Sequence, residues 1–175
     1  FGMMGLAVDL GWSFFVKRAA QSAVDAGAMA AMREALVHGV PGTFTCGTAV
    51  GVYCAPTPLP CDTVLASPGT YLNLVSGCRY AEANGFTYNG HGNRQVVTIQ
   101  SNDRSSPPPG APGVNDVRYW VTLSITETIP QMFSAVLGNP NGRVTARATA
   151  GAAPECARCG RGARADRVLE RRRLF

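Results

Sequence analysis

The first 38 residues carry a hydrophobic pattern that predicts one long helix, because no proline interrupts the chain between Phe1 and His38. The stretch before Lys17 is an apolar block whose single charge is Asp9, and Lys17 and Arg18 close that block. Alanines with a polar stripe at helical spacing follow, which is typical of an amphipathic helix. The predicted helix is roughly 57 Å long, whereas its apolar block covers only about 24 Å.

This apolar block is shorter than the roughly 30 Å hydrocarbon core of a bilayer. We therefore expect it to be the remainder of a longer segment that was truncated or processed upstream. Trp12 and the neighbouring pair Lys17 and Arg18 are typical of a helix anchored at a membrane boundary, where aromatic and basic side chains gather. The alternative is an ordinary buried helix of a soluble domain.

The rest of the pattern predicts an α+β domain over residues 39–151. Prolines and glycines exclude a long regular element between Val40 and Ala66, and Ser67 with Pro68 then begins a second helix that presents Cys78 to the core. Period-two patterns predict strands at residues 95–101, 117–126 and 143–149, with a polar loop at 102–115 and a short helix from Pro130. The predicted order, α-α-β-β-α-β, places the helices on one side of a small, mostly antiparallel sheet.

Charge is concentrated at the C-terminus. The chain is 15% charged with a formal net charge of +5, and most of this excess lies in the arginine-rich residues 152–175. The body is therefore nearly neutral and offers no basic face for nucleic acid. The tail either binds an acidic partner or lipid head groups, or is disordered.

Six cysteines indicate disulfides and hence a location outside the reducing cytosol. Four of them fall in the loop-rich segment: Cys46, Cys54, Cys61 and Cys78. Their spacing lacks the paired two-residue gaps of common zinc modules, so we expect two bridges, with Cys78 tying the second helix to the preceding loop. Cys156 and Cys159 have redox-motif spacing without the strand-to-helix context that lowers a thiol pKa, which favours a structural or incidental pair.

No arrangement of residues is typical of an active site, so we expect no catalytic residue, cofactor or metal. His38 and His91 lie in loop-like contexts without an acid or cysteine at ligand spacing. Asp9 is the acid to explain, because an unpaired carboxylate in apolar surroundings is costly. It either sets register through Lys17, Arg18 or a neighbouring subunit's amino terminus, or lies at the membrane surface or caps a water pocket.

Several separated segments resemble one family. They are Gly5–Gly11 followed by Gln21–Ala31, then Tyr80–Phe86, and near the end Thr128–Phe133, Leu137-Gly138 and Val144–Ala150. Together, over roughly residues 1–150, they resemble the TadE/TadG-like proteins of tight-adherence (Flp) pilus systems. A phenylalanine that begins a hydrophobic helix is also similar to a processed type IV pilin.

The resemblance implies a bacterial envelope protein whose N-terminal helix (residues 1–38) lies in the inner membrane or in a fibre, with its domain outside the cytoplasm. We expect a structural, pilin-like subunit of a surface filament that assembles with copies of itself and with other pilus-system proteins, after residence in the inner membrane. The alternative is a membrane-anchored TadG-like assembly protein or minor pilin that acts as a monomeric envelope module. The expected assembly residues are Phe1, Gly5, Leu6, Asp9, Gly11, Phe14, Lys17 and Arg18, with the alanine sides of the helix allowing close approach between copies.

Overall fold

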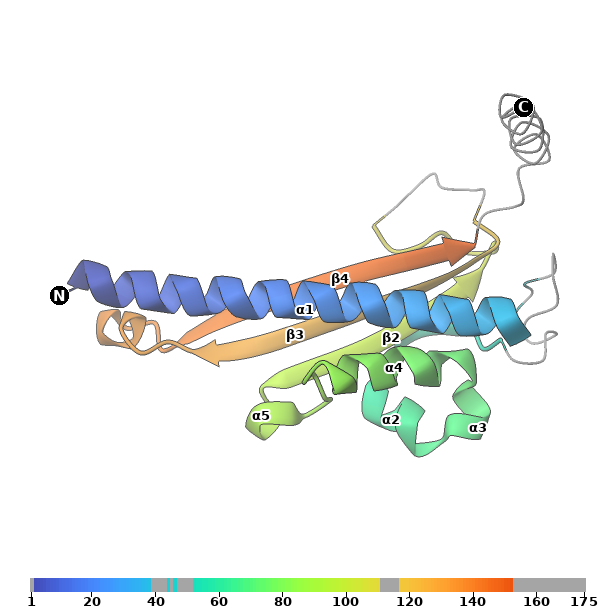
Figure 1. The fold of residues 1–175 in the computed structure, drawn as a ribbon, viewed down its shortest axis with the longest axis horizontal. Coiled ribbons are helices and arrows are strands. Elements are labelled where there is room, and N and C mark those ends of the chain that lie inside the picture. Colours follow the sequence, from blue (N-terminus) through green and yellow to red (C-terminus); the bar gives the residue numbers. More distant parts are fainter. Residues whose placement is uncertain (1, 39–43, 45, 47–51, 111–116, 153–175) are drawn as a thin grey trace, which may run out of the picture.

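The protein combines one long helix with a four-stranded antiparallel sheet (Figure 1). The computed structural model describes residues 2–38, 44, 46, 52–110 and 117–152. The elements are α1 (Gly2–His38), β1 (Ala55–Pro60), α2 (Cys61–Ala66), α3 (Pro68–Tyr71), α4 (Asn73–Ala83), α5 (Gly90–Asn93), β2 (Gln95–Asp103), β3 (Tyr119–Pro130), the 3-10 helix η1 (Ser134–Leu137) and β4 (Asn141–Ala152). The predicted α+β class and the long N-terminal helix are confirmed.

The predicted order of elements is wrong in several places, and it lacks the short helices α2 and α5. The strand β1 lies where a loop was expected, because its prolines argue against a central strand but are tolerated at the edge of a sheet. The expected second helix is divided into α3 and α4 at Leu72, whose φ of 39° is not helical. The short helix after Pro130 is the 3-10 turn η1, which ends at Gly138 in the left-handed conformation.

The sheet has one buried face and one polar face. Its order is β1-β2-β3-β4, and the central pairing aligns Ile99 with Leu123 and Leu123 with Ala148. These side chains face the helices, whereas the alternate positions carry Thr, Ser, Gln and Arg residues on the other face. Figure 1 shows α1 along β3 and β4 with α4 beside it over β2, so the predicted one-sided packing of the helices is confirmed.

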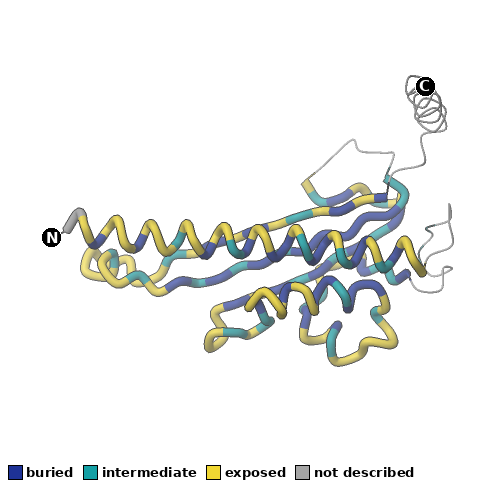
Figure 2. Tube along the Cα trace, in the orientation of Figure 1, coloured by how far each residue is buried: buried dark blue, intermediate teal, exposed yellow. Residues whose placement is uncertain are grey.

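The C-terminal part of α1 belongs to the same hydrophobic core as the strands. Its buried residues are Ala20, Ala23, Val24, Ala28, Ala31, Met32 and Ala35. Small side chains let α1 and α4 approach closely: a Cβ on Gly27 would lie 2.9 Å from the carbonyl oxygen of Gly77. Figure 2 shows this contrast along α1, with buried positions frequent towards His38 and scarce towards the N-terminus.

Two disulfides hold the segment before β2. Cys46 pairs with Cys54, and Cys61 at the start of α2 pairs with Cys78 on the buried side of α4. The prediction of two bridges within this segment is confirmed, but Cys78 ties its helix to α2 and not to the loop that was expected there. Cys156 and Cys159 lie outside the described residues.

Candidate functional site

In the N-terminal half of α1 (residues 4–16), the polar side chains face the protein and the large apolar side chains face outward. Within the described residues of this half, the large exposed side chains are all apolar: Met4, Leu6, Val8, Leu10, Trp12, Phe14 and Phe15. The two polar side chains, Asp9 and Ser13, instead contact the hairpin end, which we define as residues 131–140 between β3 and β4. A helix that is apolar around its exposed circumference is not typical of a surface in contact with water.

Asp9 binds three successive backbone amides of the hairpin end. The Met132 amide donates to Oδ1 at 3.1 Å, and the amides of Phe133 and Ser134 donate to Oδ2 at 3.0 and 2.7 Å. The residue is only 5% exposed. These bonds, from the Ser134 amide first, hold the pKa of Asp9 below its ordinary value although burial opposes the shift.

Two further contacts fasten the hairpin end to α1. The Gln131 side-chain amide donates to the Ser13 hydroxyl at 3.0 Å. Gly5 faces the Phe133 side chain so closely that a Cβ on Gly5 would overlap the ring. The hairpin end is therefore docked along the N-terminal half of α1 by a glycine, a carboxylate and a hydroxyl. These three residues follow one another at intervals of about one helical turn.

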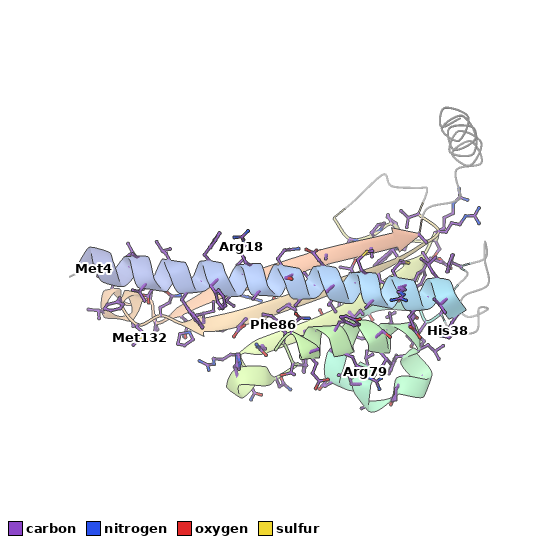
Figure 3. All side chains as sticks on the ribbon, in the orientation of Figure 1. Met4, Arg18, His38, Arg79, Phe86 and Met132 are labelled. Carbon is purple, nitrogen blue, oxygen red and sulfur yellow. A yellow bond between two sulfur atoms is a disulfide. The ribbon has the colours of Figure 1, made fainter. Side chains whose placement is uncertain are left out.

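The hairpin end adds its own apolar side chains to this part of the molecule. Met132, Val136 and Leu137 are 78%, 85% and 78% exposed. Met132 lies at the same end of the molecule as Met4 (Figure 3). We call the exposed apolar side chains of residues 4–15 and these three residues the apolar tip. The exposed polar residues Asn139 and Asn141 follow η1 and mark the end of the apolar tip along the chain.

Exposed basic residues mark the border between the apolar tip and the polar body. Val16 packs with Ile129 and Val144 in a small hydrophobic cluster, which brings β4 to the level of Val16 on α1. The next residue on α1 is Lys17, and Arg143 precedes Val144, so both lie at this level with Arg18 and all three are exposed. The Arg18 guanidinium lies 5.6 Å from the centre of the Phe14 ring.

The expected assembly residues divide into two groups. Leu6, Gly11, Phe14, Lys17 and Arg18 are exposed, and a Cβ on Gly11 would meet no atom within 4 Å. In contrast, Gly5 and Asp9 already contact the chain's own hairpin end. Phe1 lies outside the described residues.

Two expectations need correction. Most alanines of the helix are covered by the chain's own sheet and α4, so this side of α1 is not open to another copy. Within the described structure Asp9 pairs with neither Lys17 nor Arg18, and its carboxylate instead accepts the amides of residues 132–134. Sequence analysis missed this docking because backbone amides carry no sequence signature; the isolated carboxylate in an apolar block was its only signal.

Each histidine has an acidic partner, and the expectation that His38 lies in a loop-like context without an acid at suitable spacing is wrong. His38 ends α1, and its Nε2 lies 3.0 Å from Oε1 of Glu34 one turn earlier. His91 Nδ1 lies 2.8 Å from Oε1 of Glu127, a residue 36 positions away on β3. Both are pairs of a histidine with one carboxylate.

A comparison with known protein families finds a match, which lies in this N-terminal region. The family described as "Putative Flp pilus-assembly TadE/G-like" matches residues 1–34. Over these residues the chain is similar to that family. The resemblance stated from Gly5–Gly11 and Gln21–Ala31 is thus confirmed for this region, which includes Asp9 and most of α1.

The match does not extend over the rest of the TadE/G-like resemblance. The segments Tyr80–Phe86, Thr128–Phe133 and Val144–Ala150 lie beyond residue 34, so their similarity to the family stays a prediction. Searches of curated proteins and of solved structures find no match for the chain. Among the described helices, none has the length and apolar character needed to cross a bilayer.

Proposed function

We propose that the protein is a membrane-attached envelope module of an Flp pilus-assembly system. In this proposal the apolar tip contacts the membrane, while the disulfide-bonded domain lies outside the cytoplasm and contacts other pilus-system proteins. The module acts by binding, without catalysis, cofactor or metal. The observation that carries the proposal is the inverted polarity of α1, whose polar side chains Asp9 and Ser13 face inward while the surrounding side chains face outward and are apolar.

Three further findings support this location and role. The family match at residues 1–34 concerns pilus assembly. The disulfides Cys46–Cys54 and Cys61–Cys78 favour an oxidising compartment. The alanine face and Gly5, which would allow close packing between copies, are occupied within the chain, and this favours a module that acts as a monomer.

A pilin-like structural subunit is the second candidate function. Gly11 favours it, because this exposed glycine leaves open space where the helix of another copy could approach closely. The two candidates share the family and the envelope location. They differ in what covers the N-terminal half of α1, which is lipid in the first case and another copy in the second.

Cross-linking in membranes separates the two candidates. The Gly11→Cys variant, in a Cys156→Ser/Cys159→Ser background, is inserted in vesicles and oxidised, with Met29→Cys on the exposed outer side of α1 as the matched control. The first candidate predicts that the chain floats with the vesicles and that both variants stay monomeric on a non-reducing gel. Disulfide-linked dimers formed through Cys at position 11, but not at position 29, would establish contact between copies and reject the monomeric module.

Loss of the encoding gene tests the role in pilus assembly itself. We expect a deletion strain to lack pili in electron micrographs and the parent gene to restore them. Normal piliation of the deletion strain would reject both candidates.

A further inference from the structure

The apolar tip contains two segments that are far apart in the sequence, and several polar groups of the hairpin end are bound inside the chain. The amides of residues 132–134, which turn into η1, are bound by Asp9, and the Gln131 side chain is bound by Ser13. Unpaired backbone amides are costly in hydrocarbon, so a non-helical segment can enter it only when its polar groups are bound by protein. Three successive amides of the hairpin end and the Gln131 side chain meet this requirement through α1.

We propose that the hairpin end enters an anionic lipid leaflet together with the N-terminal half of α1, as one wedge whose depth is set by Lys17, Arg18 and Arg143. This inference rests on the proposed membrane attachment and adds a second inserting segment, an orientation and a lipid preference. The outward side chains of the hairpin end, Val136 and Leu137, lie in the hydrocarbon region.

The distribution of apolar side chains fixes the orientation of the wedge. An interfacial helix that lies flat has one polar and one apolar face. On α1, exposed apolar side chains surround the helix on every side that the hairpin end does not cover. The helix therefore enters end-on. From Met4 to Lys17 it rises about 20 Å, which suffices for one leaflet of a hydrocarbon core roughly 30 Å thick.

The charges at the border favour an anionic lipid over a second copy. Lys17, Arg18 and Arg143 are exposed, whereas the acids Asp9 and Glu127 are 5% and 8% exposed and bound to hydrogen-bond partners. The exposed acid Asp25 lies seven residues beyond Arg18, about two helical turns further towards the body. A parallel copy would bring an identical set of cations to the same level, where like charges repel. Phosphate head groups at that level complement them.

Vesicle binding by matched variants tests the wedge. The full chain is mixed with vesicles of phosphatidylcholine containing phosphatidylglycerol, and its partition coefficient is measured by co-sedimentation. We expect Val136→Ser/Leu137→Ser to lower partitioning at least tenfold. The control, Leu36→Ser/Val37→Ser, changes the same two residue types on an exposed turn of α1 outside the tip and should leave partitioning unchanged.

A second pair of variants tests the basic border. Lys17→Gln/Arg18→Gln should lower partitioning by about fivefold per charge on anionic vesicles and leave it unchanged on pure phosphatidylcholine. The control Arg33→Gln/Arg79→Gln removes two exposed charges from the body and should have a smaller effect.

The outcomes separate this inference from the function on which it rests. If the parent chain does not bind vesicles, membrane attachment itself is wrong. If the parent binds and Val136→Ser/Leu137→Ser binds equally well, α1 attaches alone and the wedge is wrong. If that variant instead weakens self-association in sedimentation without changing vesicle binding, the tip contacts a second copy and the lipid partner is wrong.

Discussion

The two halves of α1 obey opposite rules within one continuous helix. Towards its C-terminus the helix buries alanines, Val24 and Met32 against the sheet and α4, and it exposes Gln21 and Asp25 together with three apolar side chains, Met29, Leu36 and Val37. Towards its N-terminus it buries Asp9 and exposes Val8, Phe14 and other large apolar side chains. This difference supports the proposal that one helix joins two environments, an aqueous one around the domain and an apolar one around the tip.

Removing the Cys61–Cys78 bridge should have the largest effect on stability, because it pins α4, the helix that covers the C-terminal half of α1. The Cys61→Ala/Cys78→Ala variant should lose about 3 kcal/mol of unfolding free energy in urea, since the bridge closes a loop with a sequence separation of 17. The Cys46–Cys54 bridge, with a separation of 8, is the comparison and should contribute about 2.5 kcal/mol. Equal stability of the parent and the Cys61→Ala/Cys78→Ala variant would show that α4 docks without the bridge.

Two identical substitutions on α1 should differ strongly in their effect. Val24 is fully buried and Val8 is 57% exposed. Val24→Ala should lower the free energy of unfolding by about 1.5–3 kcal/mol, because it removes buried methyl groups and leaves a cavity. Val8→Ala should change it by less than about 0.5 kcal/mol. Similar losses in thermal or urea unfolding would mean that Val8 is buried in the folded chain.

Replacing a glycine by alanine should change the free energy of unfolding in opposite directions in the two halves of α1. A Cβ on Gly27 would lie 2.5 Å from Leu123 Cδ2 and 2.9 Å from the Gly77 carbonyl oxygen, so Gly27→Ala must push α4 away. We expect a net loss of about 1–2 kcal/mol after the gain in helix propensity. Gly11→Ala meets open space and should gain up to about 1 kcal/mol. A stabilising Gly27→Ala would contradict the close contact of α1 and α4.

The docking of the hairpin end should respond locally to Asp9. Its carboxylate is the bound form, and the lowered pKa means that the docking it provides is complete above the ordinary aspartate value of about 3.9. Docking is then lost as the pH falls through the lower native pKa. Asp9→Asn should give the same loss at neutral pH, seen as faster hydrogen exchange of the amides of Met132, Phe133 and Ser134.

The control for this experiment is the exchange of amides in the β2–β3 ladder, which Asp9 does not touch. These amides should exchange at the parent rate in Asp9→Asn. Unchanged protection of residues 132–134 in the variant would show that the hairpin end is held by Gln131 and Phe133 alone.

Local patterns predicted much of the fold, and long-range contacts account for the rest. The helix to His38 and the alternation in β3 follow from neighbouring residues. The edge strand β1 could not be predicted, because its prolines are typical of a loop and its pairing with β2 depends on the fold. The break at Leu72 was equally hidden, because no residue type there favours a positive φ.

The sequence revealed one of the two segments that form the candidate site, the N-terminal half of α1, but not the hairpin end. Its apolar block, the lone Asp9 and the basic pair after Val16 are adjacent in the chain and indicated an unusual helix. Their partner, the hairpin end, lies more than 120 positions away and binds through backbone amides, which any residue supplies. Only the fold brings Met132 beside α1 and reveals that the buried side of this half is the polar one.

The two tryptophans offer the most direct test of the inverted helix, because the chain has one in each environment. Trp12 is 54% exposed on the apolar tip, and Trp120 is 1% exposed on β3. The variants Trp120→Phe and Trp12→Phe leave one reporter each, and their fluorescence is measured in vesicles that contain lipids brominated along the acyl chain. We expect strong quenching and a blue shift for Trp12 and neither for Trp120. Trp12 emission that stays unquenched while the chain remains bound to the vesicles would contradict insertion of the apolar tip.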